Sequence, residues 1–255
     1  SAGSQIGGAE AGHRNVISGN SGVGVILMAS STLQGNYVGL NIAGNKGNLN
    51  GDAQTGDWHN LQIGPGVSAQ IGGELPPGAS PGQPPGNVIG GHIHSRGYRT
   101  RILGNIIGAD RTGSTQIGTG AIFVDGDKNV IGSPLGANLI PGGIHISSQN
   151  HIVQGNFIGA GLNGAKFENN GPLIRIEVPA SGNLIGGRTP GEGNKLAGGT
   201  RAISNTSSTF WGGRPDEYLG NEIRDFTEAG IHGFENAANP PRILYAGPLS
   251  GNNSA

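Results

Sequence analysis

The chain has 255 residues, of which 52 are glycine, 34% are hydrophobic and 12% are charged. Such values in a non-repetitive chain would favour disorder, but here the apolar residues recur in short, regular runs. The formal net charge of −1, with neither sign gathered in blocks, excludes strong electrostatic attraction to nucleic acid or to an anionic membrane. The absence of cysteine excludes disulfides, thiolate metal sites and a cysteine nucleophile.

A short repeat runs along the chain and predicts its fold. The pattern is Asn-X-(Ile/Val/Leu)-X-Gly, or a shorter form ending Ile-Gly or Val-Gly. We expect its asparagines to occupy corners, because Asn and Gly tolerate left-handed backbone and a side-chain amide there can bond to the next turn of the chain. We assign this structural role to Asn15, Asn36, Asn87, Asn105, Asn129, Asn156, Asn183 and Asn194.

Apolar residues alternate with other residues at 120–125, 143–147 and 173–178, which is typical of strands. The leading apolar residues recur every 22 to 30 residues, at Ile63, Ile93, Ile122, Ile144, Ile174, Ile203 and Ile231. Most intervals also hold two Asn-X-Ile-Gly strands, which makes three strands per interval. The sequence therefore predicts an all-β, single-stranded parallel β-helix, a solenoid of about eight to ten coils that forms one domain over residues 1–255.

Three stretches, 14–20, 34–39 and 103–113, resemble the Asn/Gly-rich repeats of large bacterial extracellular proteins. Those repeats are assigned to the right-handed parallel β-helix, or pectin-lyase-like, superfamily. The resemblance covers nearly the whole chain and implies right-handed winding and an extracellular or cell-surface location. It implies no single activity, because the superfamily contains polysaccharide lyases, glycoside hydrolases, epimerases, adhesins, phage tailspikes and passive stalks.

The repeat is interrupted near 45–60, 74–86 and 205–218, and it ends in an irregular segment, 236–255. Insertions in a solenoid usually project from one face, where they line a binding groove or remain as tolerated surface loops. Aromatic rings in or near these features could stack on sugars. The candidates for carbohydrate binding are Phe123, Trp58, Trp211 and Tyr218, although Trp211 could equally fill the core or contact a cap.

One outward column offers a candidate catalytic site. If the isoleucines and valines face inward, Phe123, His145 and Arg175 align outside, and Asp125, Ser147 and Glu177 form the next column. Two coils would then separate Asp125 from Glu177 by roughly 10 Å. That is near the upper end of the ~6.5–9.5 Å spacing of an inverting glycosidase pair. The alternative is an ordinary solvated face of a β-helix.

The candidate catalytic residues are therefore Asp125, Glu177, His145 and Arg175. They depart from the better-known enzymes of the superfamily. Polygalacturonase-like hydrolases carry an Arg-Ile-Lys motif, whereas Arg175-Ile-Glu177 reverses the final charge. Pectate-lyase-like enzymes carry a dense acidic calcium cluster, which this sequence lacks.

Metal sites have little support. His92 and His94 share one strand face, and His145 and His232 open similar strands, yet no third ligand stands at useful spacing. Asp125 could begin a calcium loop, but too few oxygen ligands lie nearby, and a polar turn explains it better. We therefore expect neither a metal nor another cofactor.

The repeat begins almost at once, at 5–8, which leaves little sequence for an N-terminal cap. We therefore expect either flanking domains of a longer protein or homotypic end-to-end contacts, for example with the segment 241–250. Two functions follow. The first is an extracellular structural or adhesive module, able to assemble into filaments through uncapped coils. The alternative is a polysaccharide hydrolase or lyase. Polysaccharide is a further candidate partner, and we expect neither nucleic acid binding nor membrane insertion.

Overall fold

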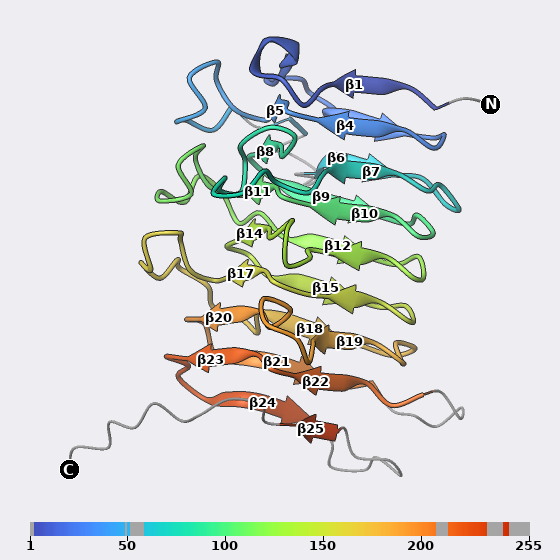
Figure 1. Ribbon diagram of the computed structural model, residues 1–255, viewed down its shortest axis with the longest axis vertical. Coiled ribbons are helices and arrows are strands. Elements are labelled where there is room, and N and C mark those ends of the chain that lie inside the picture. Colours follow the sequence, from blue (N-terminus) through green and yellow to red (C-terminus); the bar gives the residue numbers. More distant parts are fainter. Residues whose placement is uncertain (1–2, 49, 52–58, 208–213, 234–241, 245–255) are drawn as a thin grey trace.

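A computed structural model describes residues 3–48, 50–51, 59–207, 214–233 and 242–244. Over these residues the chain winds into stacked coils, with the N-terminal coil at one end of the stack (Figure 1). Three sheets run along the stack, with nine strands in sheet A and eight each in sheets B and C, and every pairing between strands is parallel. Each coil adds one strand to each sheet, so the predicted β-helix, of about eight coils, is confirmed.

The strands are short and repeat in the order A, B, C. Sheet A holds β1 (Gln5–Gly7), β4 (Thr32–Gln34), β7 (Gln70–Gly72), β10 (Arg101–Leu103), β13 (Val130–Ile131), β16 (Ile152–Val153), β19 (Leu184–Gly186), β22 (Glu217–Leu219) and β25 (Arg242–Leu244). Sheet B holds β2 (Val16–Ile17), β5 (Tyr37–Val38), β8 (Val88–Ile89), β11 (Ile106–Ile107), β14 (Leu139–Ile140), β17 (Phe157–Ile158), β20 (Lys195–Ala197) and β23 (Glu222–Arg224). Sheet C holds β3 (Val25–Leu27), β6 (His59–Ile63), β9 (His92–Ser95), β12 (Ile122–Val124), β15 (Ile144–Ile146), β18 (Ile174–Ile176), β21 (Arg201–Asn205) and β24 (Ala229–Gly233).

The core is a column of apolar side chains, one layer per coil. In sheet C the aligned residues, each 0% exposed, are Leu61, Ile93, Ile122, Ile144, Ile174 and Ile203. Burying one such side chain stabilises the fold by about 1.5–3 kcal/mol. The sequence places Ile63 at the head of this column, but Leu61 takes that place. A register shift between His59 and Leu61 leaves Ile63 opposite Ser95.

The corner before sheet B carries an unbroken ladder of asparagines. At each of its seven steps, the backbone N and the Nδ2 of one asparagine both donate to the Oδ1 of the next, over 2.9 to 3.2 Å. Its members are Asn15, Asn36, Asn87, Asn105, Asn138, Asn156, Asn194 and Asn221. Six of them belong to the predicted set. Asn138 begins a full match to the repeat, Asn-Leu-Ile-Pro-Gly, that the predicted set omits, whereas Asn221 lacks the closing glycine.

A second ladder lies at the corner before sheet A and uses mixed residue types. Backbone N–H groups donate along the series Thr100, Asn129, His151, Asn183 and Asp216, over 2.8 to 3.2 Å. Asn129 and Asn183 are the remaining predicted asparagines. A shorter ladder of Asn20, Asn50 and Asn60 connects sheet B to sheet C. All three corners therefore satisfy buried backbone donors with polar side chains of the next coil.

The residue before each of the first four members of the second ladder adopts left-handed backbone. The φ angles are +57° at Arg99, +60° at Lys128, +60° at Asn150 and +68° at Gly182. Glycine and asparagine are the usual residues in this region, whereas other side chains cost about 1–2 kcal/mol there. Two basic residues therefore occupy a corner position that strains them.

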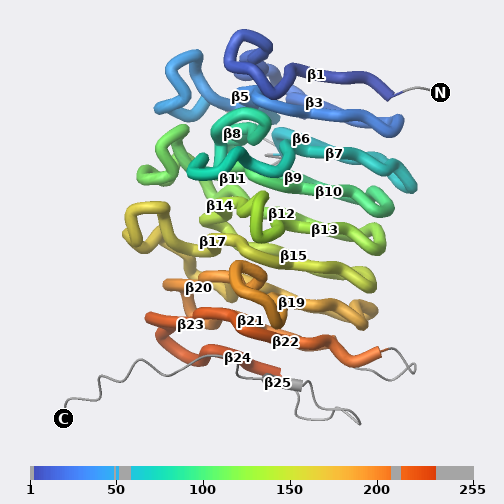
Figure 2. Tube along the Cα trace, viewed as in Figure 1, coloured from blue at the N-terminus to red at the C-terminus, as the bar shows by residue number. Residues whose placement is uncertain are grey.

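The connections alternate between coils. The second, fourth and sixth coils carry hairpins between sheets B and C, closed by the antiparallel bridges Leu40–Gly47, Ala109–Gln116 and Ala160–Lys166. These hairpins are the blue, green and yellow loops on the left of Figure 2. Successive hairpins touch, since Arg111 N donates to Gly44 O over 2.8 Å and Leu162 N donates to Gly113 O over 3.1 Å. They cover the outer face of sheet B and enclose a second apolar cluster of Tyr37, Leu40, Val88, Ile106, Ala109, Leu139 and Phe167.

The odd-numbered coils instead have the longer connections between sheets A and B. The first contains a 3-10 turn, η1 (Ala11–His13), and the second is the predicted proline-rich insertion, between β7 and β8. This insertion covers the tight corner of the preceding coil, because Gly35 N donates to Pro85 O over 3.0 Å. These connections differ in length, since residues 73–87 separate β7 from β8 but only residues 132–138 separate β13 from β14, and the intervals along sheet C vary with them.

Two other predicted irregular segments contain strands. Glu217 and Tyr218 belong to β22, and residues 242–244 form β25. The rest of 236–255 lies outside the described residues, and the rest of 205–218 and the interruption near 45–60 are described only in part. Within the described residues, no helix is long and apolar enough to cross a membrane.

Candidate functional site

The outer face of sheet C holds the residues that the sequence singles out for chemistry. Strands β12, β15 and β18 align so that Phe123 lies beside His145 and His145 lies beside Arg175. The isoleucines and the valine between them are buried. The predicted outward column is therefore confirmed, and one residue beyond the ends of these strands are Asp125, Ser147 and Glu177.

Asp125 is the most strongly bonded member of this group. Its Oδ2 lies 2.5 Å from His94 Nε2, and its Oδ1 accepts a hydrogen bond of 2.7 Å from the hydroxyl of Ser147. Burial raises the pKa of the Asp125 carboxyl, but hydrogen bonds from His94 and Ser147 and the positive charge of Arg96 lower it by more. Asp125 is therefore a carboxylate at neutral pH.

These contacts limit what Asp125 can do. A general acid needs a raised pKa, so a carboxyl with a lowered pKa suits the role of a base or a charge partner. The Ser147 hydroxyl donates to this carboxylate, and no contact of the described residues joins that hydroxyl to an imidazole. An activated serine nucleophile needs an adjacent base to take its proton, and the carboxylate is a much weaker base than an imidazole.

The second candidate carboxylate has a different partner. Glu177 Oε1 lies 3.2 Å from Arg175 Nε, and both side chains are about half exposed, at 49% and 47%. Asp125 and Glu177 are thus each paired with separate neighbours on the strand face. The geometry unites Arg175 with Glu177 and His94 with Asp125, rather than bringing the two carboxylates onto one shared group.

His145 lies between these two pairs. Its ring stacks at a tilt on Phe123, with centroids 4.6 Å apart. Burial lowers the pKa of the His145 imidazole, the positive charge of Arg175 lowers it further, and Glu177 partly opposes both. His145 is therefore neutral at physiological pH and is a poor proton donor there.

Phe123 is the centre of a cluster of imidazole rings. Ring centroids lie 6.0 Å from Phe123 at His59, 5.4 Å at His92 and 6.3 Å at His94, in addition to His145. His59 and His94 approach each other to 5.0 Å. Sequence reasoning placed His92 and His94 as surface residues and missed His59. The alternating His-Ile-His of β9 signals one polar face, but only the register brings β6 beside it.

The other predicted carbohydrate-binding aromatics do not form a surface with Phe123. Tyr218 is 2% exposed and packs in the main core, with its hydroxyl accepting a hydrogen bond of 2.8 Å from Asn205 Nδ2. Its ring therefore offers no open face to a sugar. Trp58 and Trp211 lie outside the described residues.

Within the part of the chain that the structure describes, no three His, Asp or Glu side chains gather to hold a metal ion. The His92 Nδ1 accepts a hydrogen bond from Ala121 N over 3.0 Å. The carboxylate of Asp127 accepts one from Gln149 N over 2.9 Å. Both groups thus have protein partners of their own.

Comparison with protein-family models, with curated proteins and with solved structures gives no significant match. What is established is the architecture. The chain is a β-solenoid.

Proposed function

We propose that the chain is a structural and adhesive β-solenoid module of an extracellular protein. The observation that carries this proposal is the continuity of its three sheets and of the asparagine ladder, which runs without a break from Asn15 to Asn221. Such a stack places hydrogen bonds along its whole length and resists bending. A rod of this kind suits a stalk or spacer that presents its faces to partners.

The pairings on sheet C favour this role over catalysis. A polysaccharide hydrolase needs one carboxyl with a raised pKa and a second group that faces the same bond. Asp125 has a lowered pKa, and Glu177 is paired with Arg175. A carbohydrate-active enzyme acting on this face, through Asp125, Glu177, His145 and Arg175, remains the alternative because a charged residue pair, a histidine and an aromatic ring do share one strand face.

The catalytic alternative is tested with D125N and E177Q, two nearly isosteric changes of exposed side chains. Reducing-end release and formation of unsaturated sugars would be followed on neutral and acidic polysaccharides. We expect wild type and the double variant to give the same background rate. Turnover by wild type that the double variant loses, while its melting temperature is unchanged, would overturn the proposal.

End-to-end contact would extend the module into a filament. Within the described residues, β1, β2 and β3 each pair with a strand on one side only, so their free edges could accept a further coil. That coil could come from a second copy or from another part of a longer protein. Val16 on β2 is 40% exposed and lies at this end of the stack.

Sedimentation velocity over a range of concentrations tests the assembly. We expect wild type to associate, V16D to remain monomeric, and I152D to associate as wild type does. Ile152 is the matched control, because it is similarly exposed, at 37%, but lies in β16 in the middle of the stack. A wild type that stays monomeric throughout, or equal association of V16D, would exclude assembly through the first coil.

A further inference from the structure

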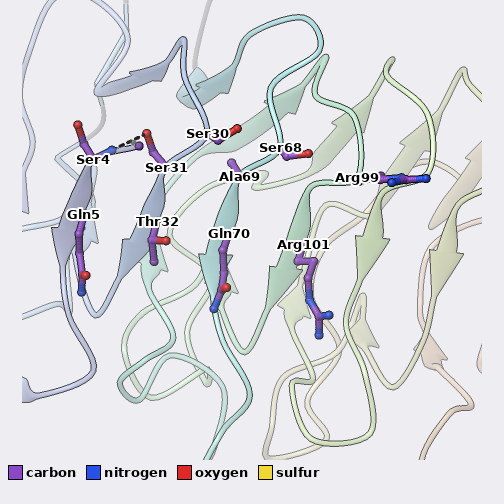
Figure 3. Close-up of a pocket in the computed structure, with 11 residues that line it drawn as sticks. Ser4, Gln5, Ser30, Ser31, Thr32, Ser68, Ala69, Gln70, Arg99 and Arg101 are labelled. Carbon is purple, nitrogen blue, oxygen red and sulfur yellow. Dashed lines mark hydrogen bonds between the residues drawn. The ribbon is translucent and has the colours of Figure 1, made fainter. Parts of the chain in front are cut away.

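A hollow of about 400 Å³ crosses the outer face of sheet A over the first four coils. Figure 3 shows its wall, in which one side chain per strand lies in a row. The register aligns this row, with Gln5 opposite Thr32, Thr32 opposite Gln70 and Gln70 opposite Arg101. A second row, along the neighbouring corner, contributes Ser30, Ser68 and Arg99.

The first three members of the row are neutral hydrogen-bonding groups. Gln5 and Gln70 are exposed and Thr32 is half-buried. Parallel strands lie about 4.8 Å apart, so the row from Gln5 to Arg101 spans roughly 14 Å. The strand separation of about 4.8 Å is close to the length that one sugar ring adds to an extended glycan. Amide and hydroxyl groups can both donate and accept, as sugar hydroxyls do.

The fourth coil closes the hollow with two guanidinium groups. Arg99 and Arg101 are both exposed, and no acidic residue of the described chain lines the hollow beside them. Arg101 Nη2 lies 3.5 Å from Glu74 Oε1, but both side chains are about half exposed, at 51% and 55%. An exposed pair of this kind is weak and can be displaced by an anion that binds Arg101. Guanidinium forks favour the planar oxygens of carboxylate and sulfate groups.

The backbone at Arg99 gives an independent reason to assign a function to this end. Arg99 holds left-handed backbone, which Gly182 adopts without strain at the same corner three coils later. Strain that the surrounding fold imposes concentrates at binding sites. Lys128, one coil beyond, repeats the same arrangement, and its Nζ lies 5.3 Å from the centre of the Tyr98 ring. The Cζ of Arg99 lies 5.1 Å from the centre of the same ring.

We propose that this hollow binds a linear acidic polysaccharide, laid along the solenoid axis, with separate carboxylate or sulfate groups on Arg99 and on Arg101 and sugar hydroxyls on the row from Gln5 to Gln70. The proposal rests on the adhesive part of the proposed function and gives it a surface and a ligand class. Nucleic acid fits less well, because it presents a phosphate at every nucleotide, whereas positive charge gathers at only one end of this row.

Binding is tested by calorimetry at low salt with four probes: alginate oligosaccharides, heparin oligosaccharides, neutral dextran and single-stranded DNA. We expect one of the two acidic glycans to bind and dextran to bind much more weakly. Which of the two binds distinguishes carboxylate from sulfate recognition. R101Q should weaken binding about tenfold, as expected for loss of one hydrogen-bonded ion pair.

R99G separates binding from stability. Glycine relieves the left-handed backbone, so the melting temperature should stay the same or rise while affinity for the acidic glycan falls about tenfold. N150G is the matched control for R99G. Asn150 occupies the same corner position two coils later, with a φ of +60° against +57° at Arg99, but lies outside the hollow. It should leave affinity unchanged.

Several outcomes would overturn the inference. They are no binding of either acidic glycan, equal affinity of wild type, R99G and R101Q, or binding of dextran or DNA as tight as that of the acidic glycans. The sedimentation and turnover measurements on the same wild-type protein test the proposed structural role independently of this binding site. A chain that assembles and has no turnover but fails these tests would lose this site and keep the proposed structural role.

Discussion

At the residue scale, His151 shows that a corner of the second ladder can be filled by a titratable side chain. His151 occupies the place that asparagine takes at Asn129 and Asn183. Its Nδ1 accepts from Asn129 N over 3.2 Å, and its Nε2 lies 2.8 Å from Ser148 Oγ. The side chain is 1% exposed. The imidazole can accept at Nδ1 and donate from Nε2 at the same time only while it is neutral.

This position predicts a pH-dependent stability. Burial lowers the pKa of His151 to about 4, and the nearby Asp127 charge only partly opposes it. The unfolded chain, with an ordinary histidine pKa of about 6.5, binds the proton more readily. The stability contribution is therefore complete above pH 6.5 and is lost as the pH falls toward 4, by an amount on the order of 3 kcal/mol.

Chemical unfolding of wild type and H151N at several pH values checks this. Asparagine keeps an acceptor for the Asn129 amide and does not titrate. The difference between the two proteins should shift in favour of the variant as the pH falls from 6.5 to 4 and should be constant above pH 7. Parallel pH profiles would contradict the assignment.

At the element scale, the asparagine ladder acts as a single structural element that crosses all the coils. Each member between the two ends both accepts from the coil before and donates to the coil after. Asn156 Oδ1 accepts from the backbone N and the Nδ2 of Asn138, and its own Nδ2 donates to Ile131 O over 2.8 Å and to Asn194 Oδ1 over 2.9 Å. Removing the Asn156 side chain therefore leaves the backbone N–H of Asn138 without a partner and breaks side-chain hydrogen bonds to both neighbouring coils.

N156A should lower the free energy of unfolding by about 3 kcal/mol. It leaves the buried Asn138 N–H without a partner, which costs about 1–3 kcal/mol, and it removes further hydrogen bonds worth about 1 kcal/mol each. N163A is the control. Asn163 is an exposed hairpin residue whose Oδ1 accepts one hydrogen bond, of 3.0 Å, from Ala165 N. Its loss should cost at most about 1 kcal/mol. Denaturant titration measures both, and equal losses would show that the ladder adds little.

At the scale of the whole molecule, the stack has no single centre. Contacts run between neighbouring coils, so stability is shared along the axis and weakest where a coil has only one neighbour. Strands β11 and β14, in the middle, pair on both sides. Strands β1, β2 and β3 pair on one side only among the described residues.

Hydrogen exchange followed by mass spectrometry should show this gradient. Amides of β11 and β14 should exchange slowest and those of β1 to β3 fastest at low protein concentration. If the first coil assembles with another copy, its amides should become protected as the concentration rises. Protection of the first coil equal to that of the middle coils in dilute monomers would contradict the gradient.

Much of this architecture could be predicted because a repeat encodes it many times. The Asn-X-Ile-Gly pattern gives the strands and the asparagine corners, and the spacing of Ile93, Ile122 and Ile144 gives the register of sheet C. The second ladder was harder, since Thr100 and Asp216 share a corner with asparagines but no residue type with them. Its members share only their position within the coil, and that position becomes visible only when the sequences of successive coils are aligned.

The candidate sites could be predicted less well, since they depend on contacts across coils of unequal length. Gln70 lies 38 residues after Thr32, yet the two are neighbours in sheet A. The intervening loops hide that register from the sequence. The outward column around His145 was found because its coils follow closely, but the pairing of Asp125 with His94 depends on rotamers that no repeat specifies.

The alternation of connections makes the coil pair, rather than the coil, the smallest unit that can be exchanged. The tight corner glycines Gly35, Gly104 and Gly155 each donate to a carbonyl of the long connection in the following coil, and each hairpin touches the hairpin two coils away. Removal of one coil would set two hairpins on adjacent layers and leave one such glycine facing the wrong neighbour. Shortened or lengthened versions of this rod should therefore fold when whole pairs are deleted or duplicated, which fixes the step in which its reach can be engineered.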